Sequence, residues 1–187
     1  MKKAIVLSLL FILPLTYYAQ KIEENKIDPV THLLEQRTTW ERFTQGGEFN
    51  SYFRVCQYDS AFFLQLRIIN ADKKPFDIKA GQPLVLTMSD GGTVTLTCFK
   101  TTTSCQGCGA VTIAGSQVPG VEAEYALNKE QLEKLRFNVL LTKEQYEKHK
   151  KKTIEHIKID TSTNPIEHDL SEFSYLQIRK AIRLIKK

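Results

Sequence analysis

The segment YFRVCQYDSAFFLQLRII, at positions 52–69, carries a clear strand pattern, and the rest of the chain is interpreted outward from it. Its second half alternates polar side chains with apolar ones at Phe62, Leu64, Leu66 and Ile68. A period of two residues is typical of a strand with one buried face. Because Asp59 and Ser60 favour a tight turn, the segment predicts a β-hairpin of strands Tyr52–Tyr58 and Ser60–Ile69.

A second hairpin follows, with strands Leu84–Met88 and Thr93–Phe99. The linking sequence Ser89-Asp-Gly-Gly is a strong turn signal, because Asp-Gly supplies the positive φ angles that tight hairpins need. We expect the two hairpins to form a central sheet that the rest of the chain covers or closes. Further strands are predicted at Val111–Ile113 and Val121–Tyr125, at Phe137–Leu141, and in a third hairpin from Ile157 to Leu170.

Three capping boxes predict helix starts: Asn128–Gln131, Thr142–Gln145 and Ser174–Gln177. The last box opens a C-terminal amphipathic helix with basic residues outside its apolar stripe of Tyr175, Ile178, Ile182 and Ile185. Such a helix can rest on a membrane surface or dock to a partner, but we favour packing on the sheet.

The N-terminal part of the chain predicts a helix after a polar lead-in from Lys21 to Ile27. Asp28 is suited to cap a helix and Pro29 to occupy its first position. Val30, Leu33, Leu34 and Arg37 then fall on one face. This pattern fades at Thr38–Thr39.

The predicted fold class is α+β, a mainly antiparallel β-sheet built from hairpins with short helices that include an N-terminal and a C-terminal amphipathic helix. A chain of 187 residues fits one domain. We assign residues 20–187 to that domain, with residues 20–50 as its lead-in and first helix.

The first nineteen residues predict a signal peptide. Lys2 and Lys3 precede an apolar run, Ala4–Leu15, that is short for a membrane span, and a polar boundary follows at Ala19–Gln20. Tyr17 departs from the small-residue rule for cleavage, so an uncleaved anchor is the alternative. No other run is long enough to cross a membrane. The mature protein is therefore expected to be periplasmic, secreted or at the cell surface.

The charge balance argues against nucleic acid as a partner. The formal net charge is +5, and removing Lys2 and Lys3 lowers it to +3. Nucleic-acid binding needs concentrated basic patches, and export makes such a partner less accessible.

The four cysteines, Cys56, Cys98, Cys105 and Cys108, predict disulfides in an oxidising compartment. We favour Cys56–Cys98 between strands together with a local Cys105–Cys108 bridge, and Cys98–Cys105 is the alternative. A thiol enzyme acting through Cys105-Gln-Gly-Cys108 would need a helix start to stabilise its thiolate, but strand and turn residues follow. A zinc site of four thiols would need a second pair with closer spacing.

No catalytic residue, metal-binding set or cofactor motif stands out. His156 and His168 lie in opposite arms of the third hairpin near Glu155 and Asp169. They can be placed across from each other as a weak metal or acid–base cluster, but we favour a polar hairpin face.

Aromatic residues crowd positions 40–63, and an exposed aromatic surface can bind a protein or a sugar. Most of these rings are expected in the core. Tyr52, Tyr58 and Phe63 are the best candidates for a binding surface.

The chain resembles small exported β-rich proteins of Gram-negative bacteria. The resemblance rests on the first hairpin, on Ser89-Asp-Gly-Gly with Thr93-Val-Thr-Leu, and on Tyr125-Ala-Leu-Asn-Lys-Glu-Gln-Leu. It implies no catalytic residue. We therefore expect a non-catalytic exported binding or structural module for a protein or glycan ligand; the alternatives are a thiol/disulfide enzyme through the Cys105–Cys108 motif, or a hydrolase.

Overall fold

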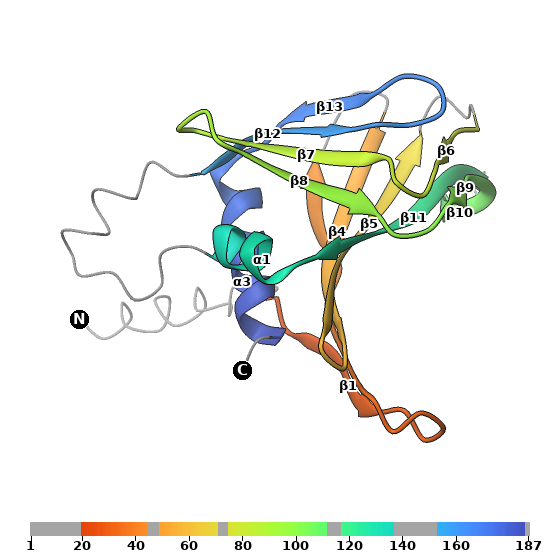
Figure 1. The fold of residues 1–187 in the computed structure, drawn as a ribbon. Helices are drawn as coiled ribbons and strands as arrows, with labels where there is room; N and C mark the ends of the chain where they lie inside the picture. The colour runs from red at the N-terminus through yellow and green to blue at the C-terminus, as the bar shows by residue number, and fades with distance from the viewer. Residues whose placement is uncertain (1–19, 45–48, 71–74, 112–116, 137–152, 186–187) are drawn as a thin grey trace, which may run out of the picture.

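The computed structural model describes residues 20–44, 49–70, 75–111, 117–136 and 153–185, with the side chains of 106–111, 117, 118, 136 and 172 excepted. These residues form strands and two helices (Figure 1). The strands are β1 (Ile22–Ile27), β2 (Leu34–Thr38), β3 (Glu41–Thr44), β4 (Phe49–Tyr58), β5 (Ala61–Asn70), β6 (Asp77–Ile78), β7 (Pro83–Met88), β8 (Thr93–Cys98), β9 (Thr102–Thr103), β10 (Cys105–Val111), β11 (Gln117–Leu127), β12 (Ile154–Ile159) and β13 (Ile166–Asp169). The helices are α1 (Lys129–Arg136) and α3 (Glu172–Ile185).

One antiparallel sheet of 11 strands dominates the fold, in the order β1-β2-β4-β5-β11-β8-β7-β12-β13, with β3 beside β4 and β10 beside β11. Strand β11 is the joint of this sheet. It pairs with β5 along Gly120–Leu127 but with β8 only at Tyr125 and Ala126. Strand β10 pairs with β11 nearer its start, at residues 117–120. The sheet therefore divides at β11, and the part formed by β8, β7, β12 and β13 lies across the part formed by β4 and β5 (Figure 1).

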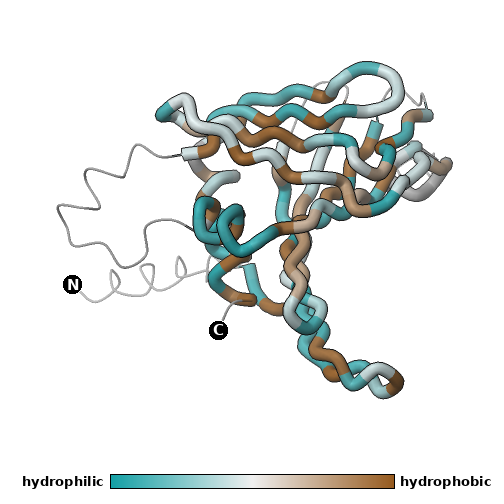
Figure 2. Tube along the Cα trace, viewed as in Figure 1, coloured by the Kyte–Doolittle hydropathy of each residue, from teal (hydrophilic) through white to brown (hydrophobic). Residues whose placement is uncertain are grey.

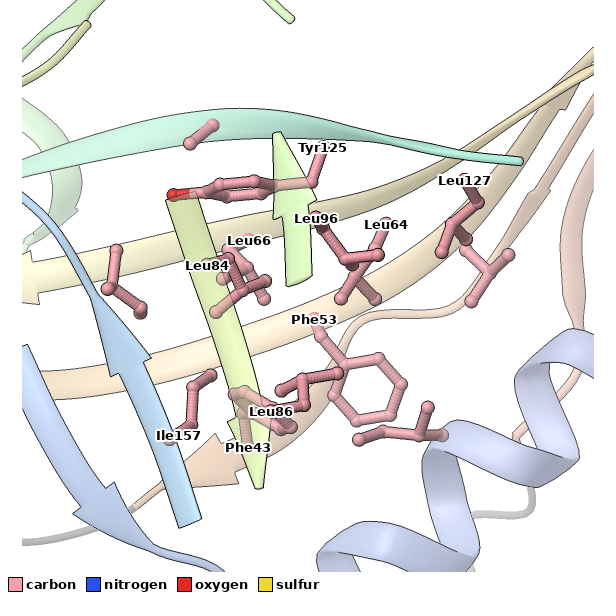
Figure 3. Close-up of a cluster of buried hydrophobic side chains, with 14 of the residues drawn as sticks. Phe43, Phe53, Leu64, Leu66, Leu84, Leu86, Leu96, Tyr125, Leu127 and Ile157 are labelled. Atoms are coloured by element: carbon pink, nitrogen blue, oxygen red, sulfur yellow. The ribbon is translucent and has the colours of Figure 1, made fainter. Parts of the chain in front are cut away.

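The core lies between these two parts of the sheet. Side chains from β4, β5, β7, β8, β11 and β12 meet there, as Figure 3 shows for Phe53, Leu64, Leu66, Leu84, Leu86, Leu96, Tyr125 and Ile157. Helix α3 contacts β2, β3, β4 and β12, and its apolar stripe is buried. The predicted packing of this helix on the sheet is confirmed. No helix in the described ranges is long and apolar enough to cross a membrane.

The hairpin turns follow from their residues. Asp59 adopts a φ of 54° between β4 and β5, and Gly91 a φ of 81° between β7 and β8. The amide of Met88 donates to the carbonyl of Gly92 at 2.8 Å, which closes the second turn. Both predicted hairpins, and the third one formed by β12 and β13, are confirmed.

The capping signals place two helix starts. Asn128 and Gln131 exchange hydrogen bonds of 2.8 Å between side chain and backbone, which confirms the predicted box at α1. Helix α3 begins at Glu172, earlier than predicted, because the hydroxyl of Ser171 accepts a 3.2 Å hydrogen bond from the Ser174 amide. The helix predicted after Thr142 and the strand predicted at Phe137–Leu141 lie outside the described residues.

The predicted N-terminal helix is wrong. Residues 22–38 form the β1–β2 hairpin instead, and Asp28 lies in its turn. The Asp28 carboxylate accepts hydrogen bonds from the amides of Val30 (2.8 Å) and Thr31 (2.7 Å), as a helix cap would. The chain does not continue as a helix, because its apolar residues have nothing to pack against: Val30 and Leu33 are exposed.

Candidate binding surface

The outer face of β4, β5 and β11 collects aromatic and charged side chains. Residues paired across antiparallel strands share a face. Tyr52 pairs with Arg67 and Arg54 with Gln65, and both β5 residues pair in turn with glutamates of β11. We call this set the outer platform; its members are Trp40, Arg42, Tyr52, Arg54, Tyr58, Phe63, Gln65, Arg67, Phe99, Glu122 and Glu124.

Trp40 is the centre of the outer platform. The guanidinium carbons of Arg54 and Arg67 each lie 4.4 Å from the centroid of its ring. Cations at this distance from an indole face are attracted by its quadrupole. Trp40 belongs to no strand, so its position depends on the turn between β2 and β3.

A polar network fixes the two arginines. Arg67 donates to Glu122 through Nε at 2.8 Å and through Nη2 at 2.5 Å. Arg54 Nε donates to Gln65 Oε1 at 2.6 Å, and Gln65 Nε2 donates to Glu124 Oε1 at 2.5 Å. These side chains therefore hold one another in place before any ligand arrives.

An aromatic row crosses the same face. The ring of Tyr58 lies 5.6 Å from that of Phe63, and Phe63 lies 5.4 Å from Phe99. The guanidinium of Arg42 lies 5.9 Å from the ring of Tyr52. Phe99 is 61% exposed, while the other rings are half-buried. The structure thus places Tyr52, Tyr58 and Phe63 on one face.

Trp40, Phe99 and the arginines were missed as members of this surface. Arg54 and Arg67 stand at polar positions within the apolar–polar alternation of their strands. That alternation indicates that both side chains point away from the core. Which residues face them depends on strand order, which local periodicity does not contain.

The β1–β2 hairpin continues the outer face as a ladder of charges. Lys26 lies 2.5 Å from Glu24 and 3.2 Å from Glu35, and Arg37 pairs with the same two glutamates. Arg37 also lies 5.6 Å from the ring of Tyr58. The hairpin and the outer platform therefore share one continuous polar face.

The predicted Cys56–Cys98 bridge is wrong, and so is its Cys98–Cys105 alternative, because Cys56 and Cys98 are free and buried. Their strands β4 and β8 are separated by β5 and β11. The two strands are therefore not neighbours in the sheet, whereas a disulfide needs its two Cα atoms within about 7 Å of each other. Burial raises the pKa of Cys56 to about 12 and also raises that of Cys98, so both thiols are protonated.

Cys105 is disulfide-bonded, and neither Cys56 nor Cys98 is its partner. The local Cys105–Cys108 bridge stays a prediction, since the side chain of residue 108 is outside the described set. The Cys105–Cys108 motif lies in strand β10 and not at a helix start. It therefore lacks the helix terminus that lowers a thiol pKa in disulfide oxidoreductases.

The two histidines of the last hairpin do not face each other, so the metal or acid–base cluster considered as the alternative does not form from this pair. His156 pairs with Asp169, and its Nδ1 lies 2.9 Å from the carboxylate, whereas His168 pairs with Ile157. Adjacent residues of a strand point to opposite faces, so the register places His168 on the other side. No cluster of three or more candidate metal ligands occurs among the described residues.

Cavities also lie beside α3. One of about 500 Å³ is lined by residues of β3, including Arg42 of the outer platform, by Asp169 of β13, and by Ser171, Phe173 and Ser174 at the start of α3. Another of about 240 Å³ lies between the β7–β8 turn, Lys134 of α1 and Tyr175 of α3. In the larger cavity, Ser171 and Ser174 are bonded to each other and Asp169 to His156. These polar groups already serve the fold, so the outer platform remains the stronger candidate site.

Comparison of the chain with known protein families, with curated proteins and with solved structures finds no match.

Proposed function

We propose that the protein is an exported, non-catalytic binding module that contacts a protein partner through the outer platform. The observation that carries this proposal is the meeting of Trp40 with Arg54 and Arg67 beside an aromatic row. Tryptophan, tyrosine and arginine are the residues most enriched at the energetic centres of protein interfaces.

The internal network of the outer platform supports the same function. Arg54, Gln65 and Glu124 are linked by hydrogen bonds, and Arg67 is held by Glu122. Because these side chains are already ordered, the platform loses little conformational entropy when a partner binds.

Two features support export. The first nineteen residues have the three parts of a signal peptide. Cys105 is in a disulfide, a bond typical of oxidising compartments, while the free thiols are buried and protonated.

The test starts by capturing proteins from the cell envelope on the immobilised mature protein and purifying the best candidate. Its affinity is then measured for wild type, Tyr52→Ala and Phe99→Ser. Hot-spot losses exceed 1–2 kcal/mol, so we expect Kd to rise about tenfold or more for each variant. Phe173→Ser is the matched control, because Phe173 is also 61% exposed but lies on α3.

Equal affinities for wild type and both platform variants would contradict the proposal. So would a signal on a glycan array that Phe99→Ser abolishes, since the platform would then bind a sugar. Thermal unfolding of each variant checks that the fold is retained.

A further inference from the structure

The β1–β2 hairpin projects from the body of the molecule and ends in apolar residues (Figures 1 and 2). Strand β2 pairs with β4 only at Glu35, Gln36 and Arg37, so the hairpin end extends beyond the rest of the sheet. We call residues 27–33 the hairpin tip. Its Ile27 is 66% exposed, its Val30 84% and its Leu33 46%. Three exposed aliphatic side chains within seven residues at the end of a projection make it a candidate interaction site.

The amide groups of the hairpin tip already have hydrogen-bond acceptors within the tip. The Asp28 amide donates to the Leu33 carbonyl at 2.9 Å, and the His32 amide to the Asp28 carbonyl at 2.8 Å. The amides of Val30 and Thr31 donate to the Asp28 carboxylate, and that of Leu33 to the Thr31 hydroxyl at 3.4 Å. Pro29 has no amide hydrogen. Every amide from Asp28 to Leu33 is thus satisfied within the tip, so burying it leaves none unpaired.

The charge of the hairpin tip indicates what covers it. Hydrogen bonds from Thr31 and Val30 hold the pKa of Asp28 below its usual value, so the carboxylate is ionised at neutral pH. An ionised carboxylate beside the apolar residues is costly in lipid. The adjoining charges alternate in sign as Lys26 pairs with Glu24 and Glu35, whereas membrane-bound segments carry an excess of lysine and arginine. A protein pocket with a cationic rim matches both features.

We infer that the hairpin tip inserts into an apolar pocket of the protein partner, where Ile27, Val30 and Leu33 are the anchors and Asp28 meets a cationic side chain at the rim. This inference rests on the proposed function, because the charge ladder joins the tip to the outer platform through Arg37 and Tyr58. The platform and the tip then form one interface, and the tip supplies its desolvated anchors.

The experiment places the photocrosslinker benzoylphenylalanine at position 30 of the full-length protein, which is irradiated with cell envelopes. We expect one crosslinked protein, suppressed by excess wild type. The variant with Ile27→Ser and Leu33→Ser should need at least a hundredfold higher concentration to suppress it, because burial of each aliphatic side chain contributes about tenfold in affinity. Leu176→Ser is the matched control, since Leu176 is 47% exposed on α3, close to the value for Leu33.

Asp28 is tested by two substitutions. Asp28→Asn keeps an oxygen for the amides of Val30 and Thr31 but removes the charge, whereas Asp28→Ala removes both. We expect competition to weaken about tenfold with Asp28→Asn and further with Asp28→Ala. If Asp28→Asn competed as well as wild type, the inferred pairing of Asp28 with a cationic side chain of the partner would be wrong.

Other outcomes overturn the inference. They are crosslinking to phospholipid, binding to vesicles of phosphatidylethanolamine and phosphatidylglycerol that the serine variant loses, crosslinking to a second copy of this chain, or crosslinks spread over many proteins. If Tyr52→Ala and Phe99→Ser weaken competition while the tip variants do not, the proposed function stands and this inference fails. If the tip variants weaken competition while Tyr52→Ala and Phe99→Ser do not, the tip belongs to the interface and the outer platform does not.

Discussion

At the scale of single residues, Cys56 and Cys98 show how burial protects a thiol from reaction. A thiolate is the reactive form, and burial raises the pKa of Cys56 to about 12. Oxidation of either thiol therefore requires opening of the sheet.

Titration with a thiol reagent tests this arrangement. We expect no fast-reacting thiol in the native protein, two after unfolding without reductant, Cys56 and Cys98, and four after reduction. Absence of any thiol in the unfolded, unreduced protein would restore the Cys56–Cys98 bridge. A fast-reacting native thiol would contradict the burial of both.

His168 couples stability to pH. Burial, and then the nearby charge of His156, lowers its pKa from the ordinary value of 6.5. The unfolded state therefore binds a proton more readily than the folded state, and stability falls as pH drops through 6.5 toward the lowered pKa.

Chemical denaturation at about pH 7.5 and about pH 5.5, which bracket the ordinary histidine pKa, measures this effect. We expect wild type to lose more stability between the two than His168→Gln does. The exposed His32 offers His32→Gln as the control, which should behave like wild type. Equal losses for His168→Gln and wild type would show that His168 does not carry the dependence.

At the scale of elements, the same capping pattern is followed by a hairpin turn at Asp28 and by a helix at Asn128. Asp28 and Asn128 both accept hydrogen bonds from amides two or three residues ahead. Asn128 is followed by α1 because Leu132 and Leu135 are buried in the core, whereas Val30 and Leu33 remain in solvent. A cap initiates a short helix only where tertiary packing continues it.

The cap of α1 makes a measurable contribution to the free energy of unfolding. Asn128→Ala removes the acceptor for the Gln131 amide and should lower the free energy of unfolding by about 1 kcal/mol. Asn128→Ser keeps a capping oxygen and should cost less. Urea denaturation compares the two, and equal stability of Asn128→Ala and wild type would remove the cap as a source of stability.

The same reasoning explains how much of the fold the sequence predicts. The β4–β5 and β7–β8 hairpins follow from alternation and from Asp-Ser and Asp-Gly turns, which are local. The position of β11 between β5 and β8, and with it the separation of Cys56 from Cys98, is set by pairing between distant segments. For the candidate site, Tyr52, Tyr58 and Phe63 are predictable as outward-facing aromatics, but Trp40 meets Arg54 and Arg67 only through that pairing.

At the scale of the whole molecule, the shared core makes both parts of the sheet one cooperative unit. Phe53 of β4 and Ile157 of β12 are both fully buried in the same cluster. Trp40, the single tryptophan, lies on the β4 side, so its fluorescence reports that part alone. Loss of packing in β12 should therefore reach Trp40 only if the two parts unfold together.

Ile157→Ala tests this coupling from the distant side. Truncating a buried isoleucine costs about 2–5 kcal/mol, and we expect circular dichroism and Trp40 fluorescence to shift to the same lower urea midpoint. Glu155→Ala, an exposed change in the same strand, should leave both midpoints near wild type. If Ile157→Ala lowered the midpoint by circular dichroism but left that of Trp40 in place, the β12 side would unfold separately, and the bend at β11 would join two independently stable parts.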